Sequence, residues 1–368
     1  MQVSRRVFNG LMATGALTIP ALSFEWGSNG SNRDAESIFE LIGGPDRPVL
    51  TRSDAGTEGN GHGFEGGRAF KFEGEYHLFM TEMIGEPMWT RTRLAHWSSG
   101  DRRKWTRRST LMASSGDFSG TDPRASLWSP MPVYDSAQGR WSMTYVAYRS
   151  KPNTKDAWCE NYQGRIWRAV STIPEFGGLG GPYEDAGILL EPGTEAASWE
   201  GLMGVDSFFP YAVGGRWLAL YGSSPERNGL AAAAALAGPW KRISRTPMTQ
   251  NTENPLVTRL EDGRYVAFFD GCGTYQKFGY LVSDDGVNWS KPVIIDIEQE
   301  PTKVKKWWGL TRTPLGLIQE STDTFTLFFT AYNKNFYDVP GIWADLSPTA
   351  TFRDYFASVG YVELRLRR

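Results

Sequence analysis

The sequence predicts an all-β fold, a five-bladed β-propeller with four-stranded antiparallel blades. Three observations lead to this prediction. A phrase consisting of a short apolar segment, a tight turn and an alternating aromatic strand recurs five times. Each copy is followed by a further strand signal and by a turn that usually leads to an aromatic residue. Helix signals are nearly absent. A radial repeat of about 48 to 76 residues, each unit holding roughly four strands, is typical of a propeller.

The N-terminal segment, residues 1–35, is expected to be a targeting signal and a flexible tether. Ser4-Arg5-Arg6-Val7-Phe8 precedes an apolar run from Leu11 to Leu22, and Ala21-Leu22-Ser23 has the small residues of a cleavage site. The arginine pair resembles a twin-arginine signal, and the apolar run is too short to span a membrane. We expect residues 36–368 to form one propeller domain, exported to the periplasm or beyond the cell without a membrane anchor.

The aromatic strand is the most regular element of each unit. It follows a Gly or Asp turn and alternates aromatic or β-branched residues, which is the signal of a strand entered from a hairpin. Its five copies are Gly74–Met80, Gly139–Tyr145, Gly215–Tyr221, Gly263–Phe269 and Asp323–Phe329.

A shorter apolar segment lies upstream of each aromatic strand and is predicted to be the innermost strand of the blade. Proline often stands near its start, where a strand does not yet need a ladder hydrogen bond. The five segments are Gly67–Phe72, Ser129–Tyr134, Phe209–Val213, Asn254–Arg259 and Thr313–Ile318.

Third and fourth strands follow downstream. The third strands are predicted at Arg93–Trp97, Gly164–Val170, Gly229–Ala234, Phe278–Val282 and Gly341–Asp345. Fourth strands are predicted at Ile188–Glu191 and Pro292–Ile297; in the last unit Val359–Leu366 fills this place or is exchanged with residues 38–50 in closing the ring. The second unit carries an insertion, Ser150–Tyr162. The run Ala231–Ala237 is interpreted as a buried strand because the flanking glycines and proline leave too little length for a helix.

Composition restricts the fold and the class of partner. The chain of 368 residues is 40% hydrophobic and 22% charged, which allows a large core. A net charge of -2 gives no electrostatic attraction for nucleic acid or an anionic membrane. Two cysteines, Cys159 and Cys272, can form at most one disulfide, and the three histidines make a multi-histidine metal site improbable. A two-sheet sandwich accounts for the strands but not for their fivefold order.

The residues at the heads of the inner strands are the candidate site. In a propeller the inner strands surround a central channel, so the residues just before them face one another across its mouth. These residues are Glu65, Trp128, Asp206, Glu253 and Arg312. Acids on the surface have no reason to keep phase with a repeat, so three acids at equivalent positions indicate a site.

The strand heads resemble those of the five-bladed propeller glycoside hydrolases of families 43, 62 and 117, and more distantly families 32 and 68. The resemblance extends over residues 36–368 in architecture, and Val205-Asp206-Ser207-Phe208-Phe209-Pro210 and Thr252-Glu253-Asn254-Pro255 carry it. It implies a pKa-tuning role for Asp206, a general acid at Glu253, and a base or nucleophile at Glu65, where these families have Asp. Family 117 enzymes use a histidine as acid, a role that would fall to His62. The longer signatures of families 32 and 68 are missing.

Glycoside cleavage explains why these groups would be needed together. One carboxylic acid must protonate the leaving oxygen, while an ionised carboxylate activates water or attacks directly. A third carboxylate nearby raises the pKa of the acid. The substrate-binding candidates are Arg68 and Arg312 for a carboxylate or acidic sugar, Trp128, Trp307 and Trp308 for stacking on a sugar ring, and Asp270 at the channel mouth. Each also has a structural interpretation, as an ion-pair partner, a packed ring or a turn cap.

The sequence therefore predicts an exported glycosidase that acts on a poly- or oligosaccharide and needs no cofactor. No ligand set for a metal is visible, although the axial channel of such a fold has room for a structural cation. Two alternatives stay open. A polysaccharide lyase or phosphorylase on the same fold would use His62 and Arg312 differently, and a non-catalytic propeller would use the acids only to bind sugar hydroxyls. The sequence does not set the sugar, the linkage, the stereochemistry or the oligomeric state.

Overall fold

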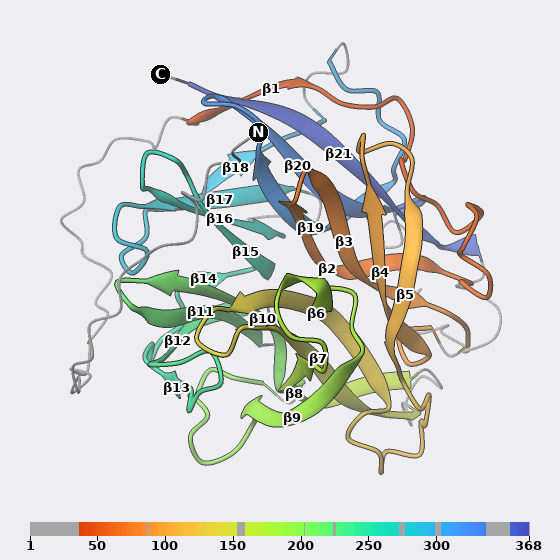
Figure 1. Ribbon diagram of the computed structural model, residues 1–368, viewed down its shortest axis with the longest axis vertical. Coiled ribbons are helices and arrows are strands. Elements are labelled where there is room, and N and C mark those ends of the chain that lie inside the picture. The colour runs from red at the N-terminus through yellow and green to blue at the C-terminus, as the bar shows by residue number, and fades with distance from the viewer. Residues whose placement is uncertain are drawn as a thin grey trace.

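Five blades of antiparallel strands surround a common centre in the computed structural model, with the inner strands nearest the middle (Figure 1). The second and fourth blades are each a 4-stranded sheet, the third is a 5-stranded sheet, and the first and fifth together form an 8-stranded sheet. The structure describes residues 37–86, 88–152, 159–201, 203–223, 226–271, 277–298, 303–335 and 354–367. The targeting signal, Cys272 and the third strand predicted at Gly341–Asp345 lie outside these residues. In the described part, the only helix is the three-residue 3-10 turn η1 (Phe176–Gly178). None of its helices is long and apolar enough to cross a membrane.

The four positions within each blade repeat in chain order. The inner strands are β2 (Gly63–Phe72), β6 (Ser126–Asp135), β10 (Val205–Val213), β15 (Glu253–Arg259) and β19 (Leu310–Gln319). The second strands are β3 (Glu75–Met83), β7 (Arg140–Pro152), β11 (Arg216–Ser223), β16 (Tyr265–Asp270) and β20 (Thr324–Tyr332). The third strands are β4 (Thr92–Ser99), β8 (Cys159–Ser171), β12 (Arg227–Ala233), β17 (Phe278–Ser283) and β21 (Ala357–Leu366). The outer strands are β5 (Thr106–Ala113), β9 (Tyr183–Leu190), β13 (Lys241–Arg242), β18 (Val293–Ile295) and β1 (Phe39–Gly43), and β14 (Thr249–Gln250) also pairs with β12.

The fifth blade closes the ring by combining the two ends of the chain. β21 pairs with β20 on one side and with β1 on the other, so Phe39 lies opposite Leu366. The segment predicted at Val359–Leu366 is therefore the third strand of this blade, and the N-terminal strand is its fourth. A single parallel bridge between Gly63 and Ala357 also links this blade to the first one. The sequence left open whether Val359–Leu366 or the N-terminal segment provides the outer strand of this blade. In the structure the N-terminal strand β1 provides it.

Two details of the second and third blades follow from their sequences. The predicted insertion at Ser150–Tyr162 lengthens the hairpin of β7 and β8, whose pairing runs out to Pro152 and Cys159. The alanine run was predicted to be a buried strand, and this is right only for its first part: Ala231–Ala233 lie in the buried strand β12. The rest of the run forms the turn after the strand, where Ala234, Ala235 and Ala237 are exposed.

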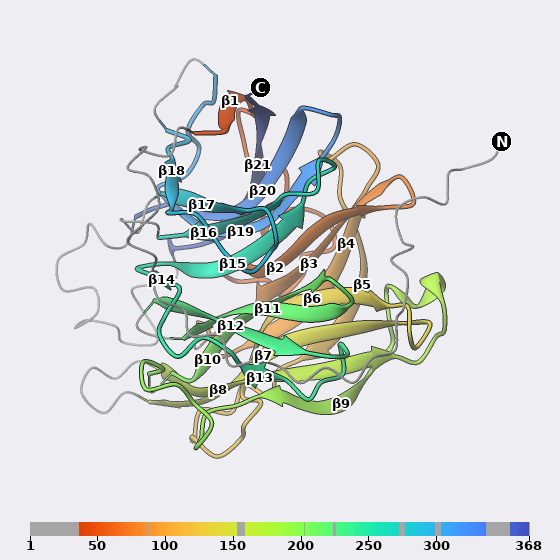
Figure 2. The same cartoon turned by 90° about the vertical axis from the view of Figure 1, so that its left-hand side faces the viewer.

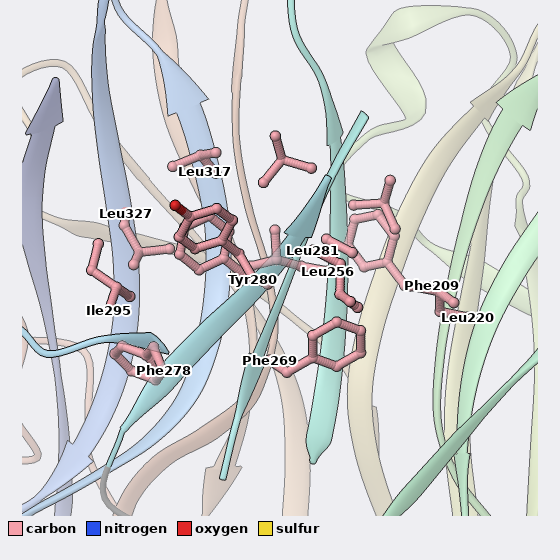
Figure 3. Close-up of a cluster of buried hydrophobic side chains, with 14 of the residues drawn as sticks. Phe209, Leu220, Leu256, Phe269, Phe278, Tyr280, Leu281, Ile295, Leu317 and Leu327 are labelled. Atoms are coloured by element: carbon pink, nitrogen blue, oxygen red, sulfur yellow. The ribbon is translucent and has the colours of Figure 1, made fainter. Parts of the chain in front are cut away.

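Large aromatic and aliphatic side chains fill the spaces between the blades. Figure 3 shows one such cluster, in which Phe209 and Leu220 of the third blade meet Phe269 of the fourth, while Leu317 comes from the fifth. The view turned by 90° shows the strands of the third blade between those of the second and the fourth (Figure 2). Full burial of one such side chain contributes about 1.5–3 kcal/mol, so inter-blade packing holds the inner strands rigidly around the axis. A rigid frame of this kind fixes the positions of the strand heads.

Candidate active site

Each inner strand contains a β-bulge beside its head residue. The pairing register shifts between Glu65 and Gly67, Trp128 and Met131, Val205 and Ser207, Glu253 and Leu256, and Thr311 and Pro314. The strands therefore begin before or at these residues rather than after them, because a bulge lets the ladder continue past a side chain that has left the alternation. Bulges re-aim side chains and are common beside active sites. Because a bulge recurs at the same position in all five inner strands, the residues predicted for the site also recur at one position of the repeat.

Glycine makes the bulge of β2 possible. Gly66 and Gly67 both have positive φ, at 62° and 141°. A Cβ atom on Gly67 would lie 1.9 Å from the carbonyl oxygen of Phe79 on the neighbouring strand, so no larger residue fits. The glycine pair beside Glu65 is thus required by the backbone that presents this carboxylate.

Arg312 of β19 binds carboxylates from two other blades. Its Nε donates to Oε1 of Glu65 at 2.7 Å, and its Nη1 donates to Oε2 of Glu253. The same Nη1 lies 3.3 Å from Oδ2 of Asp270, the last residue of β16. Its guanidinium group therefore joins Glu65 and Glu253. A sugar that reaches both acids must move Arg312 or bind beside it.

Glu65 is held at both of its oxygens. Its side chain is 8% exposed, and its Oε2 accepts a hydrogen bond of 2.6 Å from the hydroxyl of Tyr332. The indole nitrogen of Trp89 in turn donates to that hydroxyl at 3.3 Å. Trp89 has a φ of 67°, an uncommon conformation for a large residue, and its carbonyl accepts from Asn161. Glutamate thus reaches from the bulge of β2 to two partners that belong to the fifth blade.

Asp206 completes the set of acids from the strand heads. Burial raises the pKa of Asp206 well above its usual range, and the negative charges of Glu253 and Asp270 raise it further, while Arg312 opposes them. The hydroxyl of Tyr148 on β7 donates to its backbone oxygen at 3.3 Å. A carboxyl group in this position therefore holds its proton more tightly than an exposed aspartate does.

Asp270 is the fourth carboxyl group of the site. Burial raises its pKa to about 8; Arg312 lowers it, Glu253 raises it, and a hydrogen bond of 3.1 Å from Asn254 to its Oδ2 lowers it. The sequence placed Asp270 at the channel mouth as a substrate-binding candidate. The structure places it inside the acid cluster, directly opposite Glu253 in the ladder.

His62 lies apart from the hydrogen bonds of the acid cluster. It is buried, and its two ring nitrogens contact the backbone oxygen of Tyr355 at 3.2 Å and Oε1 of Glu86 at 3.0 Å. The imidazole therefore ties together the loops that precede β2, follow β3 and precede β21. Its role as an acid remains a prediction that these contacts do not support.

Arg68 lies farther along β2, where its Nη1 donates to the backbone oxygen of Pro132 at 2.7 Å. Its guanidinium group also packs over Phe209 at 5.0 Å and Phe70 at 5.4 Å. Burial lowers the pKa of Arg68 to about 10. Its described contacts are thus a carbonyl and two rings, and they include no carboxylate of the cluster.

The predicted tryptophan platforms are packed inside the protein. Trp128 is 8% exposed, and its indole nitrogen donates to Ser126. Trp308 is 4% exposed and donates to Glu298 at 2.9 Å, and Trp307 stacks on Phe329 with ring centroids 5.9 Å apart. These contacts give the Trp307–Trp308 pair a packing role against β20, because both rings already have partners in the core.

Sequence reasoning missed Tyr332, Trp89 and Tyr148. Tyr332 ends the second strand of the fifth blade, and Asp270 ends that of the fourth. Aligning the ends of the second strands, as was done for the heads of the inner strands, would have found Tyr332 because both sets border the same mouth. Trp89 lies in a connecting loop and no repeat marks it. No group of three or more His, Cys, Asp or Glu side chains in the described ranges has the arrangement of a metal site.

No known family model matches the chain, and no curated protein matches its sequence. Solved structures do match its fold. A family 117 glycoside hydrolase from the marine bacterium Zobellia galactanivorans has 13% identity and a TM-score of 0.59, with 89% of this chain and 90% of that one covered. An α-L-arabinofuranosidase from Podospora anserina, in complex with cellotriose, has 12% identity and a TM-score of 0.54, with 88% and 97% covered.

A third similar structure belongs to the GH130 family of mannoside phosphorylases, which contains glycoside hydrolases that target β-1,2 mannosidic linkages in Candida mannan. It has 12% identity and a TM-score of 0.52, with 88% of this chain and 94% of that one covered. At these identities the likeness concerns the fold. The predicted all-β propeller, and its resemblance to propeller glycoside hydrolases, are confirmed at that level.

Proposed function

We propose that this protein is a glycoside hydrolase that cleaves a poly- or oligosaccharide at the mouth of the propeller. The observation that carries the proposal is the set of carboxyl groups from the strand heads of three blades, with one arginine bound to Glu65 and Glu253. Structural ion pairs usually neutralise their acids one to one. Here the acids outnumber the cation, which is costly for stability and is expected where function requires it.

Glu253 is assigned as the general acid and Glu65 as the base or nucleophile. The negative charge of Glu253 raises the pKa of Asp206, so ionisation of both acids together is disfavoured and one of them is a source of a proton. That proton is what the leaving oxygen needs. Glu65 accepts hydrogen bonds from Arg312 and Tyr332, which fix both of its oxygens at the strand head. In the proposed reaction this carboxylate activates water or attacks the anomeric carbon.

The test is turnover on a panel of glycans, comparing the wild type with Glu253→Gln. The panel follows the similar structures and includes arabinan, cello-oligosaccharides and β-1,2-mannan, each incubated with and without phosphate. New reducing ends that require Glu253 support the hydrolase. Ultraviolet absorbance from an unsaturated uronate indicates a lyase, a requirement for phosphate indicates a phosphorylase, and binding without products indicates a sugar-binding propeller. Unchanged turnover in Glu253→Gln overturns the assignment of the acid.

Export by the twin-arginine route is part of the proposal. It rests on the motif Ser4–Phe8 and the apolar run after it. Fusing residues 1–35 to a reporter that functions only outside the cytoplasm tests it directly. Replacing Arg5 and Arg6 with lysine should abolish the signal, and a reporter that is exported equally well without the arginine pair contradicts this route.

A further inference from the structure

Asp270 is the buried acid for which the proposed reaction has no assigned step. It ends β16 and pairs in register with Glu253, and its side chain is 6% exposed. Its Oδ2 accepts from Nδ2 of Asn254 at 3.1 Å and from Nη1 of Arg312 at 3.3 Å. Asn254 has a φ of 50° and lies in the bulge of β15, so the backbone of the bulge aims this donor at Asp270.

The other carboxyl oxygen of Asp270, Oδ1, is not exposed to solvent. It has no hydrogen-bond partner in the described part of the chain. An ionised carboxylate is stabilised poorly when one of its oxygens accepts nothing. Because both donors point at Oδ2, that oxygen remains an acceptor, and a proton on this acid lies on Oδ1.

The charges around Asp270 oppose one another, because Arg312 lowers its pKa whereas Glu253 and Glu65 raise it. Arg312 faces Asp270 from β19, but Glu253 from β15, Glu65 from β2 and Asp206 from β10 also act on it or on Arg312. One cation therefore serves several acids, and a further negative charge in this cluster would compete with Glu65 and Glu253 for Arg312. A neutral Asp270 accepts the same two hydrogen bonds without that competition.

We propose that Asp270 is a positioning residue that holds Arg312 beside Glu253 through its Oδ2 while its Oδ1 carries a proton. This inference rests on the proposed function only in so far as it concerns catalysis; the state of Asp270 can be tested without a substrate. The raised pKa, about 8, agrees with it. As the pH rises through that value Asp270 ionises, draws Arg312 toward itself, and activity should fall.

Asparagine distinguishes positioning by a neutral group from other roles. Asp270→Asn keeps an oxygen for Arg312 and Asn254 and cannot ionise. It should keep kcat within about tenfold of the wild type near pH 7, and the alkaline limb of its pH profile should move to higher pH by about one unit or more. Asp270→Leu removes the acceptor, so kcat should fall by about 10²-fold because Arg312 and Glu253 lose their alignment. Asp262→Asn, at an exposed hairpin of the same blade, is the matched control and should change neither quantity.

Infrared spectroscopy provides the measurement that needs no glycan. Subtracting the spectrum of Asp270→Asn from that of the wild type cancels the bands of the other acids. At pH 6.5 the difference should contain the carbonyl stretch of a protonated carboxylic acid, and this band should disappear with a midpoint near pH 8. Crystal structures should show Arg312 on Glu253 in the asparagine variant and displaced in the leucine variant. A difference spectrum without this band, or an alkaline limb that does not move, overturns the proposal. If the wild type cleaves no glycan, the proposed function fails, and the infrared band and Arg312 position still decide this inference.

Discussion

Gly222 offers a sharp test of how closely Asp206 must be placed. This residue lies on β11 beside the head of β10, and its backbone has an ordinary negative-φ conformation that alanine adopts without strain. A Cβ atom here would lie 2.2 Å from Oδ1 of Asp206 and 2.3 Å from Oγ of Ser207. Ordinary van der Waals contact begins at 3.4 Å, so Gly222→Ala must move the carboxyl group of Asp206 by about 1 Å.

The displacement sets the expected magnitude. Misplacing a catalytic group by ~1 Å can cost about 10²-fold in rate, so kcat/KM of Gly222→Ala should fall by that factor on the best glycan of the panel. Stability should change little, because the lower entropy of the unfolded chain, about 0.4–1 kcal/mol, offsets part of the strain. The assay is release of reducing ends, combined with thermal unfolding on the same preparation.

A matched control separates the local effect from a general one. Gly100→Ala places a methyl group in open space at a conformation that alanine also tolerates, and it should leave kcat/KM unchanged. If Gly222→Ala retains kcat/KM within about twofold of the wild type while its crystal structure shows Asp206 displaced, then the position of this acid does not matter and the reasoning is refuted.

Three further predictions concern the cation, the buried acid and the core. Arg312→Ala leaves Glu65 and Glu253 without their shared partner and should lower the free energy of unfolding by ~3 kcal/mol in chemical denaturation; an unchanged midpoint would show that the ion pairs contribute nothing. Because Asp270 has a higher pKa in the folded state than when unfolded, its contribution to stability is complete below about pH 4 and is lost as the pH rises toward 8. The melting temperature of Asp270→Asn relative to the wild type should therefore rise across that range, and a constant difference would contradict the burial argument. Trp308→Ala should cost ~3–5 kcal/mol of stability, as a core residue does, whereas a loss of glycan binding at full stability would restore the predicted sugar platform.

The strand heads could be predicted because the repeat itself carries their phase. Once Glu65, Asp206, Glu253 and Arg312 are aligned on the aromatic strands, their convergence follows from the radial geometry. The exact start of each strand could not be predicted, since a bulge extends the ladder past residues that break the alternation. Glutamate at position 65 also has an explanation that only the structure provides, because its length is used to reach Tyr332 and Arg312.

Packing between blades could not be read from local sequence. Trp307 and Trp308 follow a lysine-rich stretch that favours an exposed loop. Packing against the neighbouring strands nevertheless buries Trp308 and half-buries Trp307, and a Cβ on Gly360 of β21 would lie 2.3 Å from the ring of Trp307. Which tryptophans face a cleft depends on the distance between sheets that are far apart in the sequence. Trp89 was missed for the same reason, because its contact with Tyr332 joins a loop of the first blade to a strand of the fifth.

Ring closure in the fifth blade joins strands that lie far apart in the sequence. β1 is the first of the described strands and its partner β21 the last, so the pairing of Phe39 with Leu366 is a highly non-local contact, of the kind that forms slowly in folding. Arg312 belongs to that same blade. A chain shortened before β19 lacks Arg312, so Glu65 and Glu253 lose the cation that joins them.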